Sequence, residues 1–414
     1  DKLTQKPAVL TLLLDFMLDL LLLPYGVTWP PPPAPPAQPG QEAPPAPVPP
    51  PGLSERAVKR ALGDQPPPAE RLERLKVGIV RFLALGQLPS AIVAPHLLVA
   101  MADTRFTVAN LADMELRRLC NLDWEESALI SKLCSLYLGT PVDKNATPAV
   151  QAATREVRRQ PVGTRIRLKL LPYLSRSKTA ATMFPQSVQV MFDSFYGTNT
   201  NPKLKLLALQ FVIQIIQHST EARLAPLGPM LLSVLHGVLT EEKSDMRLRG
   251  TAYTAIGRLG QKLPSAITRD LSVVRVLFDA LEQEDAETAQ FVQDTMQLLG
   301  PSLCKLDPAQ MVVMEALLGS CLERPSARAR HVAVQYAAVV FPESHAISRL
   351  QLLLATADTQ EEVSAEALKQ LKLDEKDIQE GSKVRDFPDF AEMITCITRK
   401  ASERESKQQT TTVG

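Results

Sequence analysis

Apolar and small side chains recur at a fixed spacing along the second half of this 414-residue chain. Copies of the pattern start at residues 204, 248, 288, 329 and 363, which are 44, 40, 41 and 34 residues apart. Within a copy, the next positions follow 4, 8 and 11 residues after the first. The copies are Leu204, Ala208, Val212, Ile215; Leu248, Ala252, Ile256, Leu259; Thr288, Val292, Met296, Leu299; Ala329, Ala333, Ala337, Val340; and Val363, Ala367, Leu371. These offsets lie on one helix face, so each copy predicts an amphipathic helix.

A period near 40 residues with two helices in each period is typical of HEAT and armadillo solenoids. The same spacing occurs earlier in the chain at Val108, Ala112, Leu116 and Leu119. Strict alternation of apolar and polar residues is rare, so no sheet is expected. We therefore predict an all-α fold, a HEAT/armadillo-like α-solenoid of antiparallel helix pairs. Such arrays mostly serve as surfaces that hold other proteins.

Turn residues between the apolar runs set the expected helix boundaries. Helices are predicted at residues 69–84, 91–102, 164–175, 185–196, 227–240 and 246–262. In the first of these, the apolar positions are Leu72, Leu75, Ile79 and Leu83. These four positions follow helical spacing, which supports the helix.

Residues 1–26 are predicted to form one helix of a partial N-terminal repeat. The stretch from Val9 to Leu23 is very apolar, but Asp15 and Asp19 lie one helical turn apart within it. A central aspartate costs about 2.5–3.5 kcal/mol in membrane insertion, and a span needs about 20 residues. We therefore predict a buried solenoid helix with one wet face and no transmembrane span. The two acids also disfavour a secretory signal.

A proline-rich segment follows at residues 27–53, where 13 of the chain's 34 prolines lie between Pro30 and Pro51. Such a stretch supports neither helix nor sheet, so a disordered loop is predicted. The simplest interpretation is a spacer of free composition. Proline runs also dock SH3 and WW domains, although no basic residue lies in this run to orient an SH3 domain.

The rest of the chain is predicted to form a repeat array followed by a charged tail. The HEAT-like array covers residues 54–373, beginning with a helix capped by Ser54, and is interrupted by a loop near residues 139–161. Residues 374–414 are a charged C-terminal segment with one predicted helix at 390–402 and a disordered end.

Composition narrows the function classes without naming one. Charged residues make up 22% of the chain and the net charge is +1, so no electrostatic argument favours a nucleic-acid partner. The five cysteines show no paired spacing, which favours reduced thiols in the cytosol or nucleus. No histidine has a metal-ligand partner at the usual spacing, and no phosphate-binding, dinucleotide or hydrolase motif is present. The sequence therefore predicts no enzyme, no metal and no cofactor.

One stretch in the first half is strongly basic. Its members are Arg155, Arg158, Arg159, Arg165, Arg167, Lys169, Arg176 and Lys178, and Glu156 is the acid among them. Such a patch could bind an acidic protein face, a phosphoinositide head group or RNA. Tyr173 is the one aromatic residue there, which argues against single-stranded nucleic acid. The alternative is a solvated basic face without a partner.

A basic residue also recurs within the repeated spacing, at Lys205, Arg249 and Arg330. In a HEAT-like unit, this residue can bind an acid in the preceding turn or in the next repeat. Asp245 stands in the preceding turn and is the expected partner of Arg249. We interpret the recurring basic residue as a ladder that fixes how repeats stack.

Several short sequences resemble those of one protein family. They are Leu12–Asp19, Pro24–Gly26, Gly78–Val80, Asp103–Arg105, Tyr196–Asn201, Leu227–Leu232 and Val339–Pro342. In this combination and order, they resemble the proteasome adaptor and scaffold family, whose members are very large HEAT-repeat proteins. The resemblance runs from about residue 11 to 402. Because family members are several times longer, both ends of this chain are expected to be cuts within an N-terminal region.

The resemblance implies a non-catalytic scaffold that binds the 26S proteasome. It would link or stabilise the regulatory and core particles and couple them to other cellular components. It also implies a cytoplasmic and nuclear location, with peripheral association with the endoplasmic reticulum or endosomes, and it brings no active-site residues. The repeats alone would equally suit an adaptor of nuclear transport or vesicle coats, or a phosphatase-type regulatory scaffold.

Overall fold

The computed structural model describes residues 7–26, 50–53, 68–139, 159–198, 200–241 and 245–373. The predicted helices beginning at Ser54 and at residue 390 lie outside these ranges, as do most of the two predicted loops and the C-terminal tail. The chain divides into two compact units between His218 and Ser219. In all the described ranges the regular elements are helices and no strand occurs, so the all-α prediction is confirmed.

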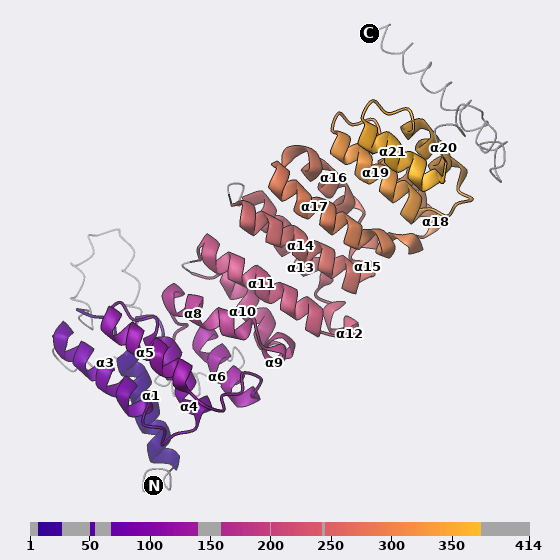
Figure 1. The fold of residues 1–414 in the computed structure, drawn as a ribbon. Helices are drawn as coiled ribbons and strands as arrows, with labels where there is room; N and C mark the ends of the chain where they lie inside the picture. Colours follow the sequence, from indigo (N-terminus) through magenta and orange to yellow (C-terminus); the bar gives the residue numbers. More distant parts are fainter. Residues whose placement is uncertain are drawn as a thin grey trace, which may run out of the picture. The chain divides into compact units, whose positions relative to one another are not determined.

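The first unit consists of helices that pack in neighbouring pairs (Figure 1). They are α1 (Pro7–Leu22), α3 (Ala69–Leu83), α4 (Ser90–Ala100), α5 (Phe106–Arg118), α6 (Ser127–Leu138), α8 (Thr164–Leu174), α9 (Lys178–Thr182), α10 (Gln186–Tyr196) and α11 (Pro202–His218). Helix α4 packs on α5, and α10 packs on α11. Helix α3 lies along α5, and α1 lies along α4, so equivalent helices of successive pairs face one another.

In the described part of the second unit, a helix–turn–helix arrangement occurs four times. Its helices are α12 (Glu221–Leu224), α13 (Gly228–Glu241), α14 (Met246–Lys262), α15 (Pro264–Thr268), α16 (Ser272–Gln283), α17 (Ala286–Leu299), the 3₁₀ helix η1 (Gly300–Lys305), α18 (Pro308–Cys321), α19 (Ala327–Val340), α20 (Ala346–Ala355) and α21 (Glu361–Leu371). The pairs are α13–α14, α16–α17, α18–α19 and α20–α21, and α14 also packs on α17 (Figure 1). The predicted helix pairs are therefore confirmed within this unit. A single array across residues 54–373 stays a prediction.

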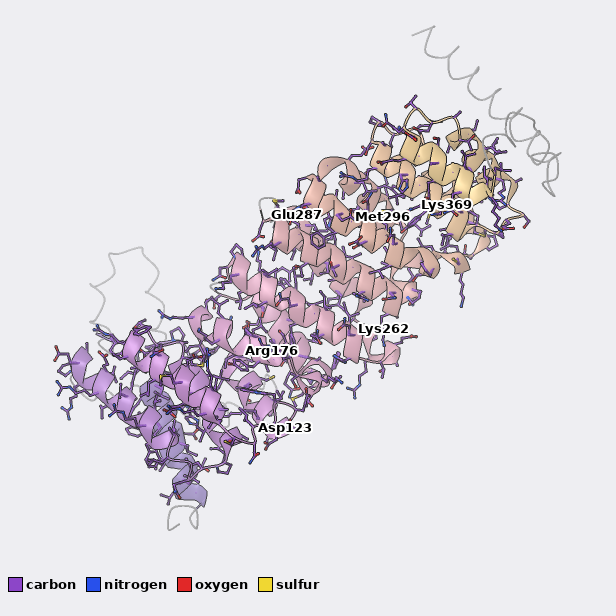
Figure 2. All side chains as sticks on the ribbon, viewed as in Figure 1. Asp123, Arg176, Lys262, Glu287, Met296 and Lys369 are labelled. Atoms are coloured by element: carbon purple, nitrogen blue, oxygen red, sulfur yellow. The ribbon has the colours of Figure 1, made fainter. Side chains whose placement is uncertain are left out.

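The repeated apolar spacing marks the second helix of each pair. Its copies lie on α5, α11, α14, α17, α19 and α21. All of their side chains are buried except that of Leu119, where the chain leaves α5 in an extended conformation. In the second unit, α17 carries Glu287 in its first turn and the buried Met296 near its end (Figure 2). The Tyr336 hydroxyl of α19 donates to the Met296 carbonyl of α17 at 2.6 Å, and this hydrogen bond joins the two helices.

Two ladder arginines each bind a carboxylate from the next helix pair. Arg249 of α14 donates from Nε to Glu284 at 3.1 Å, and its Nη2 donates to the same carboxylate. Arg330 of α19 donates to both oxygens of Asp358, at 2.7 and 2.9 Å. The prediction of a ladder to the next repeat is therefore confirmed for these two arginines. The third copy carries Ala289 at this position, so it lacks the basic residue.

The expected pairing of Asp245 with Arg249 is wrong. The Asp245 side chain accepts the backbone N–H of Leu248 at 3.0 Å and caps the start of α14. A short acidic side chain at this position satisfies a free donor of its own helix, which competes with an outward ion pair. Asp285 does the same for α17, where it accepts from the N–H groups of Glu287 and Thr288.

The Arg330–Asp358 contact makes part of the stability depend on pH. The hydrogen bonds from Arg330 hold the pKa of Asp358 below its ordinary value of 3.8. Because the folded-state pKa is depressed, the stabilisation is complete above the unfolded value and is lost as pH falls through the folded value. We expect the thermal midpoint of Asp358→Asn to decline less than that of the unmodified chain between about pH 5 and pH 2. Parallel declines, measured by circular dichroism, would contradict this linkage.

Gly260 lies at a close approach of α14 to α15 and α17. A Cβ there would stand 2.8 Å from Ile267 Cγ1 and would also contact Leu299 Cδ2. We expect Gly260→Ala to destabilise the chain by about 1–3 kcal/mol, because both side chains must move. Gly78→Ala in α3 is the matched control: no atom lies within 4 Å of the added methyl group, so a gain of about 1 kcal/mol is expected. Equal shifts of the thermal midpoint for both variants would contradict this packing.

The structure corrects the prediction that Asp15 and Asp19 lie together on a solvent-exposed face of α1. Asp19 is buried, and its carboxylate lies 2.7 Å from Nη1 of Arg159. Asp15 stays half-exposed, 3.5 Å from Nζ of Lys132. The sequence pattern failed here because the compensating charge of Asp19 comes from a residue that is distant in sequence.

The end of the proline-rich segment is packed against the residues that precede α8. The Gly52 N–H donates to the Pro161 carbonyl at 2.9 Å, and Leu53 is fully buried. Gly52 has φ +84°, and a Cβ there would lie 3.0 Å from Leu22 Cδ2. Both the backbone conformation and this close approach therefore favour glycine.

Candidate interaction surfaces

The predicted basic stretch does not form one continuous face. Arg155 and Arg158 lie outside the described residues. Arg159 precedes α8, and Arg176 follows it. The remaining members are Arg165, Arg167 and Lys169 on α8 and Lys178 at the start of α9. The structure separates these residues into buried side chains that hold helices together and exposed ones that are available to a partner.

Arg167 belongs to the buried group, with a relative exposure of 2%. Its Nη2 lies 2.6 Å from the Asp193 carboxylate of α10, and its guanidinium lies 5.0 Å from the ring centre of Tyr137 on α6. Burial raises the pKa of Tyr137 to about 12, so the phenol stays protonated and shares a 2.5 Å hydrogen bond with Ser194. Arg167 therefore joins α6, α8 and α10.

Two further arginines of the stretch bind within the fold. Arg159 pairs with Asp19 and donates from Nη1 to the Gly52 carbonyl at 3.1 Å. The Nη2 of Arg165 donates to the Asp103 carbonyl at 2.8 Å, although much of this side chain is exposed. These contacts hold the segment before α8 and the start of α8 against α1 and the α4–α5 turn.

The side chains of Arg165, Lys169, Arg176 and Lys178 are exposed. Glu125 places an opposing charge beside Lys178, because its carboxylate accepts the backbone N–H groups of Lys178 and Thr179 at 2.9 and 2.8 Å. Burial pushes the pKa of Glu125 up, but these backbone hydrogen bonds outweigh it and the pKa lies below its ordinary value. Sequence reasoning missed this acid, because it is remote from the stretch in sequence.

Arg176 stands next to an aromatic pair at the surface. Its guanidinium lies 5.9 Å from the ring centre of Tyr173, whose ring is 4.5 Å from that of Trp124. Asp123 precedes this tryptophan, and both Asp123 and Arg176 are marked in Figure 2. The exposed positive surface is therefore smaller than predicted, and its binding of a partner stays a prediction.

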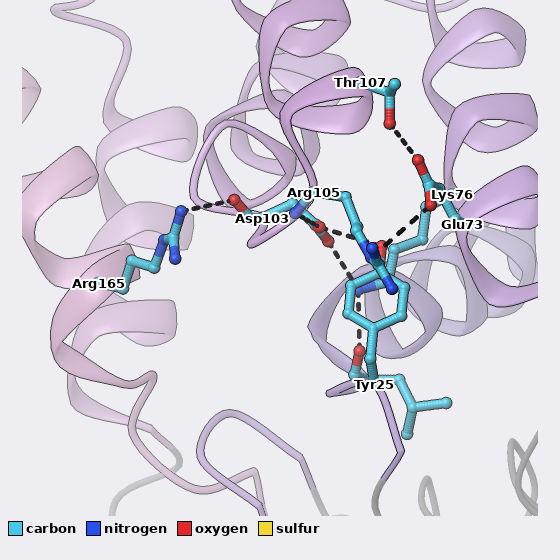
Figure 3. A network of polar contacts seen from close by, with 8 residues as sticks. Tyr25, Glu73, Lys76, Asp103, Arg105, Thr107 and Arg165 are labelled. Carbon is cyan, nitrogen blue, oxygen red and sulfur yellow. Dashed lines mark hydrogen bonds and ion pairs between the residues drawn. The ribbon is translucent and has the colours of Figure 1, made fainter. Parts of the chain in front are cut away.

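A buried polar network lies at the junction of α1, α3 and the α4–α5 turn (Figure 3). Nζ of Lys76 donates to the Asp103 carboxylate and to the Leu23 carbonyl, each at 2.8 Å. The Tyr25 hydroxyl donates to the same carboxylate at 3.0 Å, and the backbone N–H of Arg105 donates to it at 2.8 Å. The carboxylate thus accepts hydrogen bonds from three separate segments.

Lys76 is almost fully enclosed, since its side chain and that of Asp103 are each 3% exposed. Burial lowers the pKa of Lys76, and the contact with Asp103 partly offsets that effect. The Lys76 ammonium also lies 4.4 Å from the ring centre of Tyr25. Leu75 is one of the apolar positions of the predicted helix, yet it is 44% exposed, whereas Lys76 is buried. A lysine one turn after Leu72 on the apolar face of α3 was the available signal.

The second unit contains an apolar pocket of 390 Å³ between α13, α15 and α16. Leu232, Val273 and Val276 line its walls, and Arg269 lies among its lining residues. His236 and Asp270 are also among the lining residues, although most of the lining is aliphatic.

Metal-binding clusters and membrane-spanning helices are both absent from the described part of the chain. No group of three or more His, Cys, Asp or Glu residues there could hold a metal ion. In the same residues, no helix is long and apolar enough to cross a membrane.

Residues 2–355 match the sequence profile of a family described as the N-terminal part of proteasome component ECM29. The chain is 42% identical to the human proteasome adapter and scaffold protein ECM29 over 411 residues, which are 97% of this chain and 22% of that protein. It is 28% identical to a Drosophila melanogaster proteasome-associated protein, ECM29 homolog, over 379 residues, which are 86% of this chain and 19% of that protein. The chain thus spans about a fifth of the length of these relatives.

A solved chain from a structure of Kap95p with RanGDP is also similar, with a TM-score of 0.37 and 11% identity. The similarity covers 73% of this chain and 41% of that one. A likeness this weak carries no statement about fold or function.

Proposed function

This chain belongs to the family of ECM29 N-terminal regions, and from that membership we propose that it is part of a non-catalytic scaffold that binds the 26S proteasome. The scaffold would link or stabilise the regulatory and core particles and couple them to other cellular components. The observation that carries the proposal is the 42% identity, over nearly the whole chain, to a protein named as a proteasome adapter and scaffold. Because the chain spans about a fifth of that protein, the role of the whole protein is proposed for this part.

The helix pairs of each unit support this proposal physically. Stacked pairs expose long helical faces, and such faces are the surfaces that repeat proteins use to hold partners. The ladder contacts of Arg249 and Arg330 fix the spacing between successive pairs. A surface held in this way is preorganised, so binding costs less conformational entropy than on a flexible segment.

The exposed basic residues of the first unit are the proposed contact for an acidic face of a proteasome subunit. Lys169→Glu/Arg176→Glu changes only exposed side chains and is the variant that tests them. Charge reversal at Arg159 or Arg167 is unsuitable, because each pairs with a carboxylate inside the fold. We propose that the double variant weakens proteasome binding while the thermal midpoint stays unchanged. If the double variant binds the proteasome as well as the unmodified chain does, these residues form only a solvated basic face without a partner.

Affinity purification of the tagged chain from cell extract, followed by mass spectrometry, tests the main proposal. We expect subunits of the regulatory and core particles among the captured proteins. Recovery of nuclear-transport receptors, coat proteins or phosphatase subunits without any proteasome subunit would overturn it. The same proposal places the chain in the cytoplasm and nucleus, with peripheral association with the endoplasmic reticulum or endosomes. Fluorescence imaging beside a tagged proteasome subunit checks that location.

A further inference from the structure

Helix α3 carries an apolar row on its outward face. Leu75 and Phe82 are seven residues apart on the same side of the helix, and they are 44% and 37% exposed. Leu85, just beyond the helix, is 64% exposed. Gly78 lies between the first two, with no atom within 4 Å of the place its Cβ would take. The row therefore contains a hollow with an apolar side chain on either side.

Positive charges border this row. Arg71, Arg74 and Arg81 are exposed, and none of them has a hydrogen bond or ion pair with any residue that the structure describes. Helical spacing places Arg74 and Arg81 beside Gly78, on the side away from the buried face.

The acids of α3 do not balance these arginines. Glu73 is engaged by Arg105, 3.7 Å away, and by the hydroxyl of Thr107. Glu70 is exposed one helical turn before Arg74, so it can offset at most one of the three arginines. The outward face of α3 therefore combines an apolar row with an excess of positive charge.

We propose that this face of α3 binds an amphipathic helix whose apolar side is bordered by acidic residues. Leucine-type side chains of the partner would lie between Leu75 and Phe82, over the hollow at Gly78. Its carboxylates would pair with Arg74 and Arg81, and such pairs steer association and fix register. The identification of the partner as a helix of a proteasome subunit rests on the proposed function, whereas the binding chemistry does not.

A partner helix fits this surface better than a nucleic acid or a membrane does. Binding of single-stranded nucleic acid relies on several stacking aromatic rings, and Phe82 is the one aromatic side chain in the row. Stable insertion into a bilayer interface needs a broad apolar helix face. Here the core side of α3 already buries Leu72, Ile79 and Leu83, so only the narrow row is left for insertion.

The direct test uses the full chain and a fluorescein-labelled synthetic peptide of about 18 residues, long enough to form a helix on binding. The peptide carries leucine at every third or fourth position and glutamate elsewhere. We expect saturable binding in a fluorescence-anisotropy titration, weakening as salt is raised from about 50 to 300 mM. Absence of saturable binding, or equal binding of a peptide with lysine in place of glutamate, would overturn the proposal.

Two variants locate the binding on α3. Arg74→Glu/Arg81→Glu is expected to weaken peptide binding by roughly tenfold or more, because each partner carboxylate then meets a like charge. Arg247→Glu/Arg275→Glu makes the same change of net charge on exposed positions of the second unit and should leave the affinity unchanged. Gly78→Leu fills the hollow and should abolish tight binding while the thermal midpoint stays the same or rises. Unaltered affinity in both α3 variants would overturn the proposal.

The same variants, tested in proteasome capture, separate this inference from the function on which it rests. If the unmodified chain captures no proteasome, the proposed function fails, and the peptide result still decides the surface. If the unmodified chain and both α3 variants capture proteasomes equally well, the partner assignment fails and the function stands. Anionic phospholipid vesicles are the remaining probe. Vesicle binding that is lost in Arg74→Glu/Arg81→Glu, without peptide binding, would assign the face to a membrane and overturn the proposal.

Discussion

Asp103→Ala is expected to lower the thermal midpoint of the first unit by on the order of 10 °C. Removing this carboxylate leaves the enclosed Lys76 ammonium with only the Leu23 carbonyl as a hydrogen-bond acceptor. The Tyr25 hydroxyl and the Arg105 N–H lose the same acceptor. Breaking a buried ion pair by removing one partner costs about 3–5 kcal/mol, and 1 kcal/mol is worth about 2–4 °C in a unit of this size. Differential scanning calorimetry measures the shift.

Two controls make this prediction specific to the buried pair. Lys76→Met/Asp103→Asn removes both charges and should be more stable than Asp103→Ala, because no unpaired charge stays buried. Asp113→Ala removes the partner of the exposed Arg117 and should shift the midpoint little, since exposed pairs contribute about 0–1 kcal/mol. If Asp103→Ala and Asp113→Ala had equal effects, the network at Lys76 would not be a main support of the first unit.

Glu284→Ala is expected to destabilise the second unit by about 3 kcal/mol. The Glu284 side chain is 8% exposed and accepts hydrogen bonds from Arg249 and from the Tyr253 hydroxyl, the latter at 2.7 Å. These contacts join α14 to the turn before α17, so their loss should loosen one repeat junction. Amide hydrogen exchange should accelerate in α14 and α17 before it accelerates in α20 and α21.

A double-mutant cycle separates the ladder pair from the effects of either residue alone. Arg249→Met, Glu284→Ala and the double variant should give a coupling energy of about 1–3 kcal/mol. Lys372→Met and Glu343→Ala make the matched cycle on an exposed pair with a 3.0 Å contact, and there the coupling should be close to zero. If the coupling energy at Arg249–Glu284 is no larger than at this exposed pair, the ladder pair does not stabilise the stacking of repeats.

The sequence predicted the helices because their signal is local. Repeated apolar positions such as Val212 and Ile256 follow the period of a helix, and that period does not depend on the neighbouring pair. For the six helices predicted between residues 69 and 262, the predicted ends differ from the observed ones by at most two residues, because prolines and turn residues stop helices by their own stereochemistry. The sequence also predicted that a basic residue joins successive repeats, because such a residue recurs at one position of the repeated spacing.

Partners far apart in sequence could not be predicted in the same way. Arg159 and Arg167 looked like members of one basic surface, but each finds a carboxylate supplied by another helix. The sequence did not show which groups pair with Lys76, because the oxygens that do so belong to Leu23 and Asp103. A single sequence shows charge and spacing, but which charges meet depends on how helices pack.

We propose that this chain is a proteasome-binding part of a scaffold, and a direct binding titration tests this proposal. Purified 26S proteasome is titrated over the immobilised full chain, with biolayer interferometry as the readout. We predict saturable binding that Lys169→Glu/Arg176→Glu or Arg74→Glu/Arg81→Glu weakens and that Arg247→Glu/Arg275→Glu leaves unchanged. No saturable binding of intact proteasome, or of its separate regulatory and core particles, to the folded chain would contradict the account.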